Sequence, residues 1–225
     1  MTRITAGGAA LVLLFTACDV RGAAAQSALG SGRIEISGGA AWLGAQAFGS
    51  ATATETTPTG AAFNLFTTSN ELGSAAAVDA RVGVRVAGTL VVEANATYAR
   101  PELRVSVAND VESAPPITAV DRLQQYTFGG GATWYAPRQR RVVPFVAGVV
   151  GYLRQLHENA LLVETGTYYQ AGGGVLYVLG SHPDNRVKAT GIRVDVRALI
   201  LSGGVAFDGG RHATAAVAGS FFVRF

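Results

Sequence analysis

Cysteine, methionine and long apolar runs are nearly absent from this chain. Cys18 is the only cysteine, which excludes a disulfide within the chain and a multi-cysteine metal site. Charged residues make up 15% of the 225 residues, and the formal net charge of +3 is too small and too scattered to indicate nucleic-acid binding. Beyond the first residues, no apolar run approaches the roughly 20 residues of a membrane-spanning helix. If the chain crosses a bilayer, it must do so as a closed β-sheet.

Catalytic and cofactor motifs are also missing. There is no GxSxG elbow and no Walker A loop, and the triplets Gly129–Gly131 and Gly172–Gly174 do not fit a dinucleotide fingerprint. His157 and Glu158 begin like a zincin motif, but Leu161 stands where the second histidine belongs. We therefore predict a protein that is not an enzyme, with no catalytic residue, cofactor or metal. The histidines are interpreted as solvated residues in or beside connections: His157, His182 and His212.

The N-terminus has the composition of a secretory signal peptide. Arg3 supplies a positive charge, residues 9–17 an apolar core, and Ala23–Ala25 the small residues of a cleavage site. We predict cleavage after Ala25, which leaves residues 26–225 as a single exported domain. An alternative is a lipoprotein signal, because the stretch that ends at Cys18 is similar to a lipobox.

The C-terminus alternates between two kinds of side chain. One parity is uniformly free of polar atoms, and the other carries polar and small residues. A period of two places the two sets on opposite faces of a sheet, so the pattern predicts a membrane strand. The apolar set is Ala213, Ala215, Val217, Gly219, Phe221, Val223 and Phe225, and the other set is Thr214, Ala216, Ala218, Ser220, Phe222 and Arg224.

The same period predicts seven further strands, and therefore an even total of eight. The predicted strands are Arg33–Gly44, Ala75–Ala87, Leu90–Ala99, Leu123–Tyr135, Val142–Arg154, Thr167–Leu179, Gly191–Leu201 and a last one that ends at Phe225. The connections are expected to be longer at one end of the sheet, where residues 45–74 and 100–122 form polar loops. The stretch 180–190 departs from this rule, because a short turn is expected there, and it leaves the neighbouring strand boundaries open.

Charges of both signs gather on one parity of the predicted strands. We expect these side chains to face the inside of a barrel and to form a structural network that fills its lumen. The network comprises Glu35, Asp79, Arg81, Arg85, Glu93, Arg193, Asp195, Arg197 and Arg224. A soluble barrel with the opposite orientation remains an alternative, since parity alone does not distinguish inside from outside.

Aromatic residues are expected on the outer face, in two girdles at the levels of the lipid headgroups. The girdle residues are Trp42, Tyr98, Tyr126, Trp134, Tyr169, Tyr177 and Phe225, joined by Tyr152 and Phe145. The glycine triplets fall inside strands, where missing side chains permit curvature or make room for larger neighbours.

The terminal strand that ends at Phe225 resembles the closing strand of bacterial outer-membrane β-barrels, and the chain as a whole is similar to the small OmpA/OmpX-type barrels. The resemblance implies an all-β fold, a single closed eight-stranded antiparallel up-and-down transmembrane barrel in the bacterial outer membrane. It also implies that Phe221, Val223 and Phe225 form an assembly signal for the barrel-assembly machinery. Outer-membrane lipid is then a partner, and an extracellular ligand is expected at residues 45–74 and 100–122.

Three functions fit these observations. The first is a non-enzymatic barrel with a plugged, charged lumen and a structural or surface-interaction role. The second is a narrow porin-like pore for small solutes or ions. The third is a lipid-modifying enzyme at the outer rim, where His212 and Ser202 are the candidate residues.

Overall fold

The computed structural model describes residues 32–112, 114–137, 141–157, 162–182, 184–205 and 210–225. The predicted signal peptide, with Cys18 and the cleavage site after Ala25, lies outside the described residues. Within the described ranges, no helix is long and apolar enough to cross a membrane.

The described residues form eleven β-strands. Their bounds are β1 Ile34–Leu43, β2 Gln46–Thr56, β3 Ala62–Leu72, β4 Ala75–Ala87, β5 Leu90–Ala99, β6 Glu102–Ala108, β7 Ile117–Tyr135, β8 Val142–His157, β9 Val163–Ser181, β10 Ala189–Gly203 and β11 Arg211–Arg224. All of the pairings between neighbouring strands are antiparallel.

Eight of the strands pair in a ring, in the order β7-β5-β4-β1-β11-β10-β9-β8, and β8 pairs again with β7. The first and last barrel strands meet along a seam in which Ile36 lies opposite Val223. A ring leaves no unpaired edge, which satisfies the backbone hydrogen bonds of every wall strand. The predicted fold class, an eight-stranded antiparallel up-and-down barrel, is confirmed.

The predicted strand positions agree closely with the wall of the barrel. Strands β4 and β5 have the predicted bounds, whereas β8, β9 and β10 extend beyond theirs. Because β9 continues to Ser181 and β10 begins at Ala189, the connection between them is shorter than the predicted stretch 180–190. The connection is short, as expected at this end, because β9 and β10 are longer than the predicted strands.

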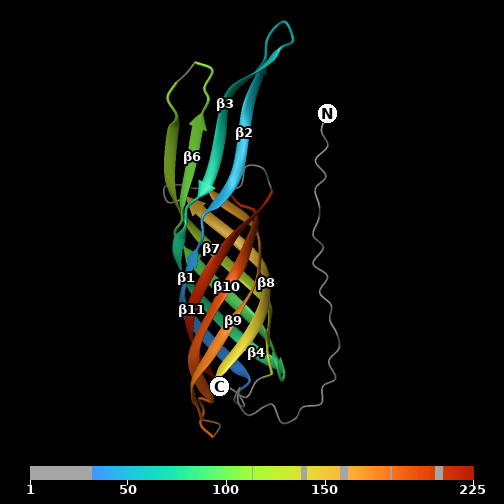
Figure 1. The fold of residues 1–225 in the computed structure, drawn as a ribbon, viewed down its shortest axis with the longest axis vertical. Helices are drawn as coiled ribbons and strands as arrows, with labels where there is room; N and C mark the ends of the chain where they lie inside the picture. The colour runs from blue at the N-terminus through green and yellow to red at the C-terminus, as the bar shows by residue number, and fades with distance from the viewer. Residues whose placement is uncertain (1–31, 113, 138–140, 158–161, 183, 206–209) are drawn as a thin grey trace.

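The prediction of two polar loops was wrong. Most of residues 45–74 and 100–122 is strand: β2, β3, β6 and the first part of β7 form a four-stranded sheet that projects beyond the ring (Figure 1). Strand β7 belongs to both sheets, since residues up to Arg122 pair with β6 and residues from Leu123 onward pair with β8. This segment is rich in threonine and serine, which suit an extended backbone but give no apolar alternation.

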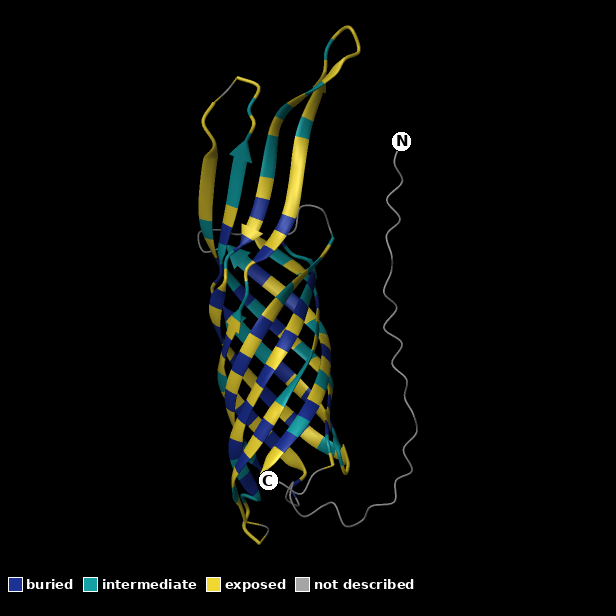
Figure 2. Cartoon of the chain, viewed as in Figure 1, coloured by how far each residue is buried: buried dark blue, intermediate teal, exposed yellow. Residues whose placement is uncertain are grey.

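The core of the molecule is the inside of the ring. Buried and exposed residues alternate along the wall strands, as Figure 2 shows, so one set of side chains fills the lumen and the other covers the outer surface. Phe145 corrects one expectation, because it is 4% exposed and packs inside against Tyr135, with the ring centroids 5.8 Å apart. Strand β8 is apolar on both parities, so its sequence does not indicate which face Phe145 occupies.

Candidate functional site: a charged lumen

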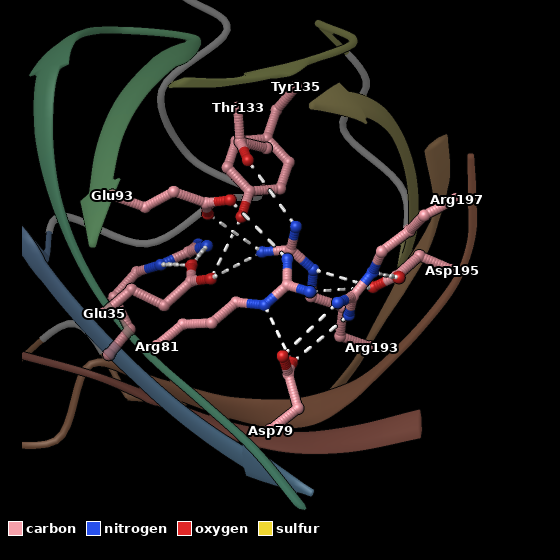
Figure 3. A network of polar contacts seen from close by, with 10 residues as sticks. Glu35, Asp79, Arg81, Glu93, Thr133, Tyr135, Arg193, Asp195 and Arg197 are labelled. Atoms are coloured by element: carbon pink, nitrogen blue, oxygen red, sulfur yellow. Dashed lines mark hydrogen bonds and ion pairs between the residues drawn. The ribbon is translucent and has the colours of Figure 1, made fainter. Parts of the chain in front are cut away.

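Four carboxylates and four arginines meet inside the barrel, each at most 6% exposed. They come from strands that lie on opposite sides of the ring, and their side chains converge near its axis (Figure 3). The carboxylates are Glu35, Asp79, Glu93 and Asp195, and the arginines are Arg81, Arg193, Arg197 and Arg224.

Arg81 and Arg193 form the centre of this network. The Arg81 Nε atom lies 2.9 Å from Asp79 Oδ1, and its Nη1 atom lies 3.5 Å from Glu93 Oε1. Arg193 reaches the same Glu93 at 3.3 Å and Asp195 at 3.4 Å. Its guanidinium also lies 4.2 Å from the centroid of the Phe145 ring, which stabilises a desolvated cation further.

Two further arginines extend the network up and down the lumen. Arg197 contacts Asp195 and also Asp79, with 3.2 Å between its Nη2 atom and Asp79 Oδ1. At the lower end Arg224 pairs with Glu35, its cross-strand neighbour at the seam. The hydroxyl of Tyr135 donates a hydrogen bond to Glu35 over 2.9 Å.

Arg85, the ninth residue of the predicted network, lies closer to the lower end of β4 and is half-buried. It interacts electrostatically with Glu35 and Arg224. All nine predicted residues therefore face the same interior.

Because the network is buried, its charges contribute to stability only if their ion pairs offset the cost of desolvation. Taking a charge out of water costs several kcal/mol per ion, which is offset only when partners surround it closely. The four buried positive charges face four buried negative charges, so no net charge is left within this group. The cross-strand neighbours of Asp195 are small, since it lies between Gly174 and Ala218, and this leaves room for long arginine side chains.

Apolar side chains close the lumen below the charges. This lower cluster packs where the strands turn back, at the end that carries the C-terminus, and its members are Val91, Tyr135, Val143, Phe145, Leu176, Val178, Ala189 and Phe222. All eight are at most 5% exposed. The lower end of the lumen is therefore packed rather than open.

A second apolar cluster closes the upper mouth. Phe48, Leu72, Leu103, Leu123 and Val205 pack together there, each at most 6% exposed. Val205 comes from the connection between β10 and β11 and turns into the mouth. Upper and lower clusters thus enclose the charges from both sides.

The turn that places Val205 in the mouth contains two glycines and is bound by the side-chain amides of Gln155 and Asn70. Gly203 and Gly204 have φ angles of +80° and +72°, which glycine adopts without strain. The backbone N–H of Val205 donates to Gln155 Oε1 over 3.1 Å, and its carbonyl accepts from Asn70 Nδ2 over 3.3 Å. A Cβ atom on Gly204 would lie 2.2 Å from Gln155 Oε1, so a larger residue would displace the amide that holds Val205.

His157 also belongs to the mouth, which corrects its interpretation as a solvated loop residue. It is the last residue of β8, and its Nδ1 atom lies 2.5 Å from Asp121 Oδ2. Its Nε2 atom lies 3.8 Å from Glu164 Oε1 on the neighbouring strand β9. The two carboxylates do not converge on one nitrogen, and the described residues contain no group of three ligands suited to a metal ion.

A small cavity lies between the charges and the mouth. Its volume is about 20 Å³, and the residues that line it include Leu43, Gln125, Gln170 and Arg197. That volume holds roughly one water molecule.

The glycine triplets make part of this filling possible. A Cβ atom on Gly129 would lie 2.3 Å from the hydroxyl of Tyr168, which fills the lumen and donates to Asn95 over 2.6 Å. The triplet therefore makes room for a larger neighbour, as the sequence suggested.

The outer surface presents the predicted girdle residues at both ends of the wall. Trp42, Trp134, Tyr169, Tyr177 and Phe225 are exposed, and the half-buried rings of Tyr98 and Tyr126 lie 4.9 Å apart across β5 and β7. Of the predicted assembly signal, Phe221 and Phe225 are exposed and Val223 is half-buried.

Ser202 and His212, the candidate pair for a rim enzyme, lie on opposite faces of the wall. His212 packs its ring against buried Phe48, with the centroids 5.0 Å apart. Ser202 has the opposite parity to buried Leu201 and therefore points outward. The structure does not bring the two side chains together.

Sequence reasoning missed the polar residues that complete the lumen. Thr133 accepts from Arg193 over 3.5 Å, and Gln125 accepts from Gln155 over 2.9 Å. Thr133, Gln125 and Tyr135 all have the inward parity of β7, opposite to Trp134, so the alternation carried the signal for them. No such signal exists for Phe48, because its strand was predicted to be a loop.

Comparisons with known proteins identify the fold. No family model and no curated protein sequence matches the chain. Among solved structures, Neisserial surface protein A superposes with a TM-score of 0.52 at 11% identity, over 85% of this chain and 97% of that one. The outer membrane protein OprG from Pseudomonas aeruginosa superposes with a TM-score of 0.50 at 14% identity, over 86% and 96%. The chain thus has the fold of small outer-membrane β-barrel proteins.

Proposed function

We propose that this protein is a non-enzymatic outer-membrane barrel with a plugged lumen, and that its projecting sheet mediates interactions at the cell surface. The observation that carries the proposal is a balanced network of buried charges inside the ring, between two buried apolar clusters. A conducting pore needs a continuous wet path, whereas side chains occupy this lumen at each of these levels.

The outer face of the wall supports a location in a bilayer. Exposed apolar side chains cover every barrel strand, as with Val78, Val82 and Val84 on β4 or Val194 and Val196 on β10. A large apolar surface of this kind is unfavourable in water and favourable in lipid. The predicted signal peptide fits the same location.

The projecting sheet supports a role at the surface. Strands β2, β3, β6 and the start of β7 present polar side chains on one face, including a cross-strand row of hydroxyls. The row consists of Ser50, Ser69, Ser106 and Thr118. Among the described strands, its outer edge strand β2 pairs only with β3, which leaves backbone groups available to a partner.

Conductance in planar bilayers tests the plugged lumen. The purified full chain should insert without producing discrete current steps. Regular steps from a homogeneous preparation would contradict the proposal and support a narrow pore instead.

Site-directed labelling in whole cells tests the location and the orientation. Thr59→Cys places a thiol at the tip of the β2–β3 hairpin, and Asp184→Cys places one in the turn at the opposite end. A membrane-impermeant maleimide should label the first variant in intact cells and the second only after the outer membrane is permeabilised. Equal labelling of both variants in intact cells would refute the orientation.

A further inference from the structure

The outward charges of the barrel wall have one sign. The acidic residues of the described barrel strands all have the inward parity, including Glu164 and Asp121 at the mouth. Arg154 on β8 and Arg211 on β11 face outward and are exposed near the upper rim. On the described barrel strands, the outward-facing charges therefore lie near the upper rim.

Polar side chains continue the line between these two arginines. Tyr152, Thr167, Ser202 and Arg211 are direct cross-strand neighbours on β8, β9, β10 and β11. All four have the outward parity, and Arg154 lies one outward position above Tyr152. The guanidinium of Arg211 also lies 5.8 Å from the centroid of the Tyr169 ring, which holds it against the wall. The row therefore offers two cations and three hydroxyls to one side of the barrel.

An apolar groove lies directly below this row. Its volume is about 370 Å³, within the range of about 300–1,000 Å³ typical of ligand pockets. Gly148, Ala171 and Ala198 are cross-strand neighbours and form its floor, and Val150, Tyr169 and Ile200 line its upper side. A Cβ atom on Gly148 would meet nothing within 4 Å, so the space outside this backbone is open.

Charge and shape together define the ligand. Arginine recognises phosphate through charge-assisted hydrogen bonds, and hydroxyl groups add donors to its oxygens. An acyl chain suits a groove whose outward-facing lining is apolar apart from the Tyr169 hydroxyl. We infer that the β8–β11 face binds a phosphorylated lipid of the outer leaflet, with its phosphate groups at Arg154 and Arg211 and an acyl chain in the groove. The inference rests on the proposed location in the outer membrane.

Lipid retention by the full chain tests this site. The protein is reconstituted in phosphatidylcholine nanodiscs that contain a small fraction of lipid A, re-extracted in mild detergent and analysed by native mass spectrometry. The wild type should retain lipid A in preference to phosphatidylcholine. The double variant Arg154→Gln/Arg211→Gln should retain roughly tenfold less, as expected for the loss of charge-assisted hydrogen bonds. Gly148→Leu fills the groove and should also lower retention.

Two control variants make the same types of substitution away from the β8–β11 face. Arg33→Gln removes an exposed arginine at the lower end of the barrel, and Gly38→Leu adds a side chain at an outward position of β1 where a Cβ atom meets nothing within 4 Å. Both should retain lipid A as the wild type does. Dephosphorylated lipid A should be retained no better than phosphatidylcholine.

Unchanged retention in Arg154→Gln/Arg211→Gln or in Gly148→Leu would overturn the inference. Displacement of the lipid by inorganic phosphate without any effect of Gly148→Leu would show an anion site only, and would overturn it as well. Failure of the protein to insert into lipid at all would instead refute the proposed location. Insertion with a heat-dependent shift in gel mobility but no retained lipid A would refute this inference alone.

Discussion

The barrel wall and the projecting sheet are made of the same kind of antiparallel strand, but they differ in what covers their faces. In the wall, one face carries buried side chains inside the ring, and the other is largely apolar. In the projecting sheet, polar and apolar side chains such as Thr52 and Ile117 are both exposed to solvent. Alternation of apolar and polar residues therefore indicates a sheet whose two faces lie in different environments. It is absent where both faces lie in the same solvent.

The two regions also use ion pairs differently. Arg193 lies among Glu93, Asp195 and Glu35 at 1% exposure, whereas Arg104 pairs with Glu102 at 3.4 Å on an exposed strand. Removal of a buried partner leaves the remaining charges uncompensated, and removal of an exposed one lets water replace it.

The largest expected effect follows from this difference. Arg193→Ala should lower the free energy of unfolding by about 3–5 kcal/mol, because it leaves buried carboxylates without their partner. Urea unfolding of the reconstituted protein measures it. The matched change Arg104→Ala should cost at most about 1 kcal/mol. Equal losses from both variants would show that the network is hydrated and the lumen is not filled.

A smaller effect is expected at the turn that closes the mouth. Gly204→Ala should cost about 1–3 kcal/mol, because the φ angle of +72° is strained for alanine and its Cβ atom would clash with Gln155. Gly60→Ala is the matched control in the β2–β3 hairpin, with a φ angle of +86° and nothing within 4 Å of a Cβ atom. If both variants lose the same stability, the contact with Gln155 contributes nothing.

The smallest effect is expected from shortening the projecting sheet. Replacement of residues 52–67 by a short Gly-Ser turn removes strand pairs that lie almost entirely within the β2–β3 hairpin. Because these residues contribute nothing to the lumen, the free energy of unfolding of the barrel should stay within about 0.5 kcal/mol of the wild-type value. Loss of the heat-dependent gel shift in this variant would mean that the hairpin is required for the barrel itself.

Much of the wall could be predicted from the sequence, and little of the projecting sheet. The bounds of β4 follow from Val78, Val82 and Val84 alternating with Asp79 and Arg81. The charges on one parity also indicated which side chains share the interior. Which of them pair could not be predicted, because the contact between Arg193 and Glu93 joins strands 100 residues apart.

The apolar cluster at the mouth could not be predicted from the sequence either. Its cluster depends on Phe48 and Val205, which come from segments without alternation and meet only once the ring has closed. The hairpins of the projecting sheet gave a polar, threonine-rich signal that is equally typical of a loop.

Strand β7 allows the most direct test, since it passes from one region into the other. Residue-resolved hydrogen exchange of the protein in lipid compares the amides of residues 117–122, in the projecting sheet, with those of residues 123–135, in the wall. The account predicts a step at Leu123, with fast exchange before it and protection close to the global stability after it. Uniform protection, or uniform exchange, along the whole of β7 would contradict it.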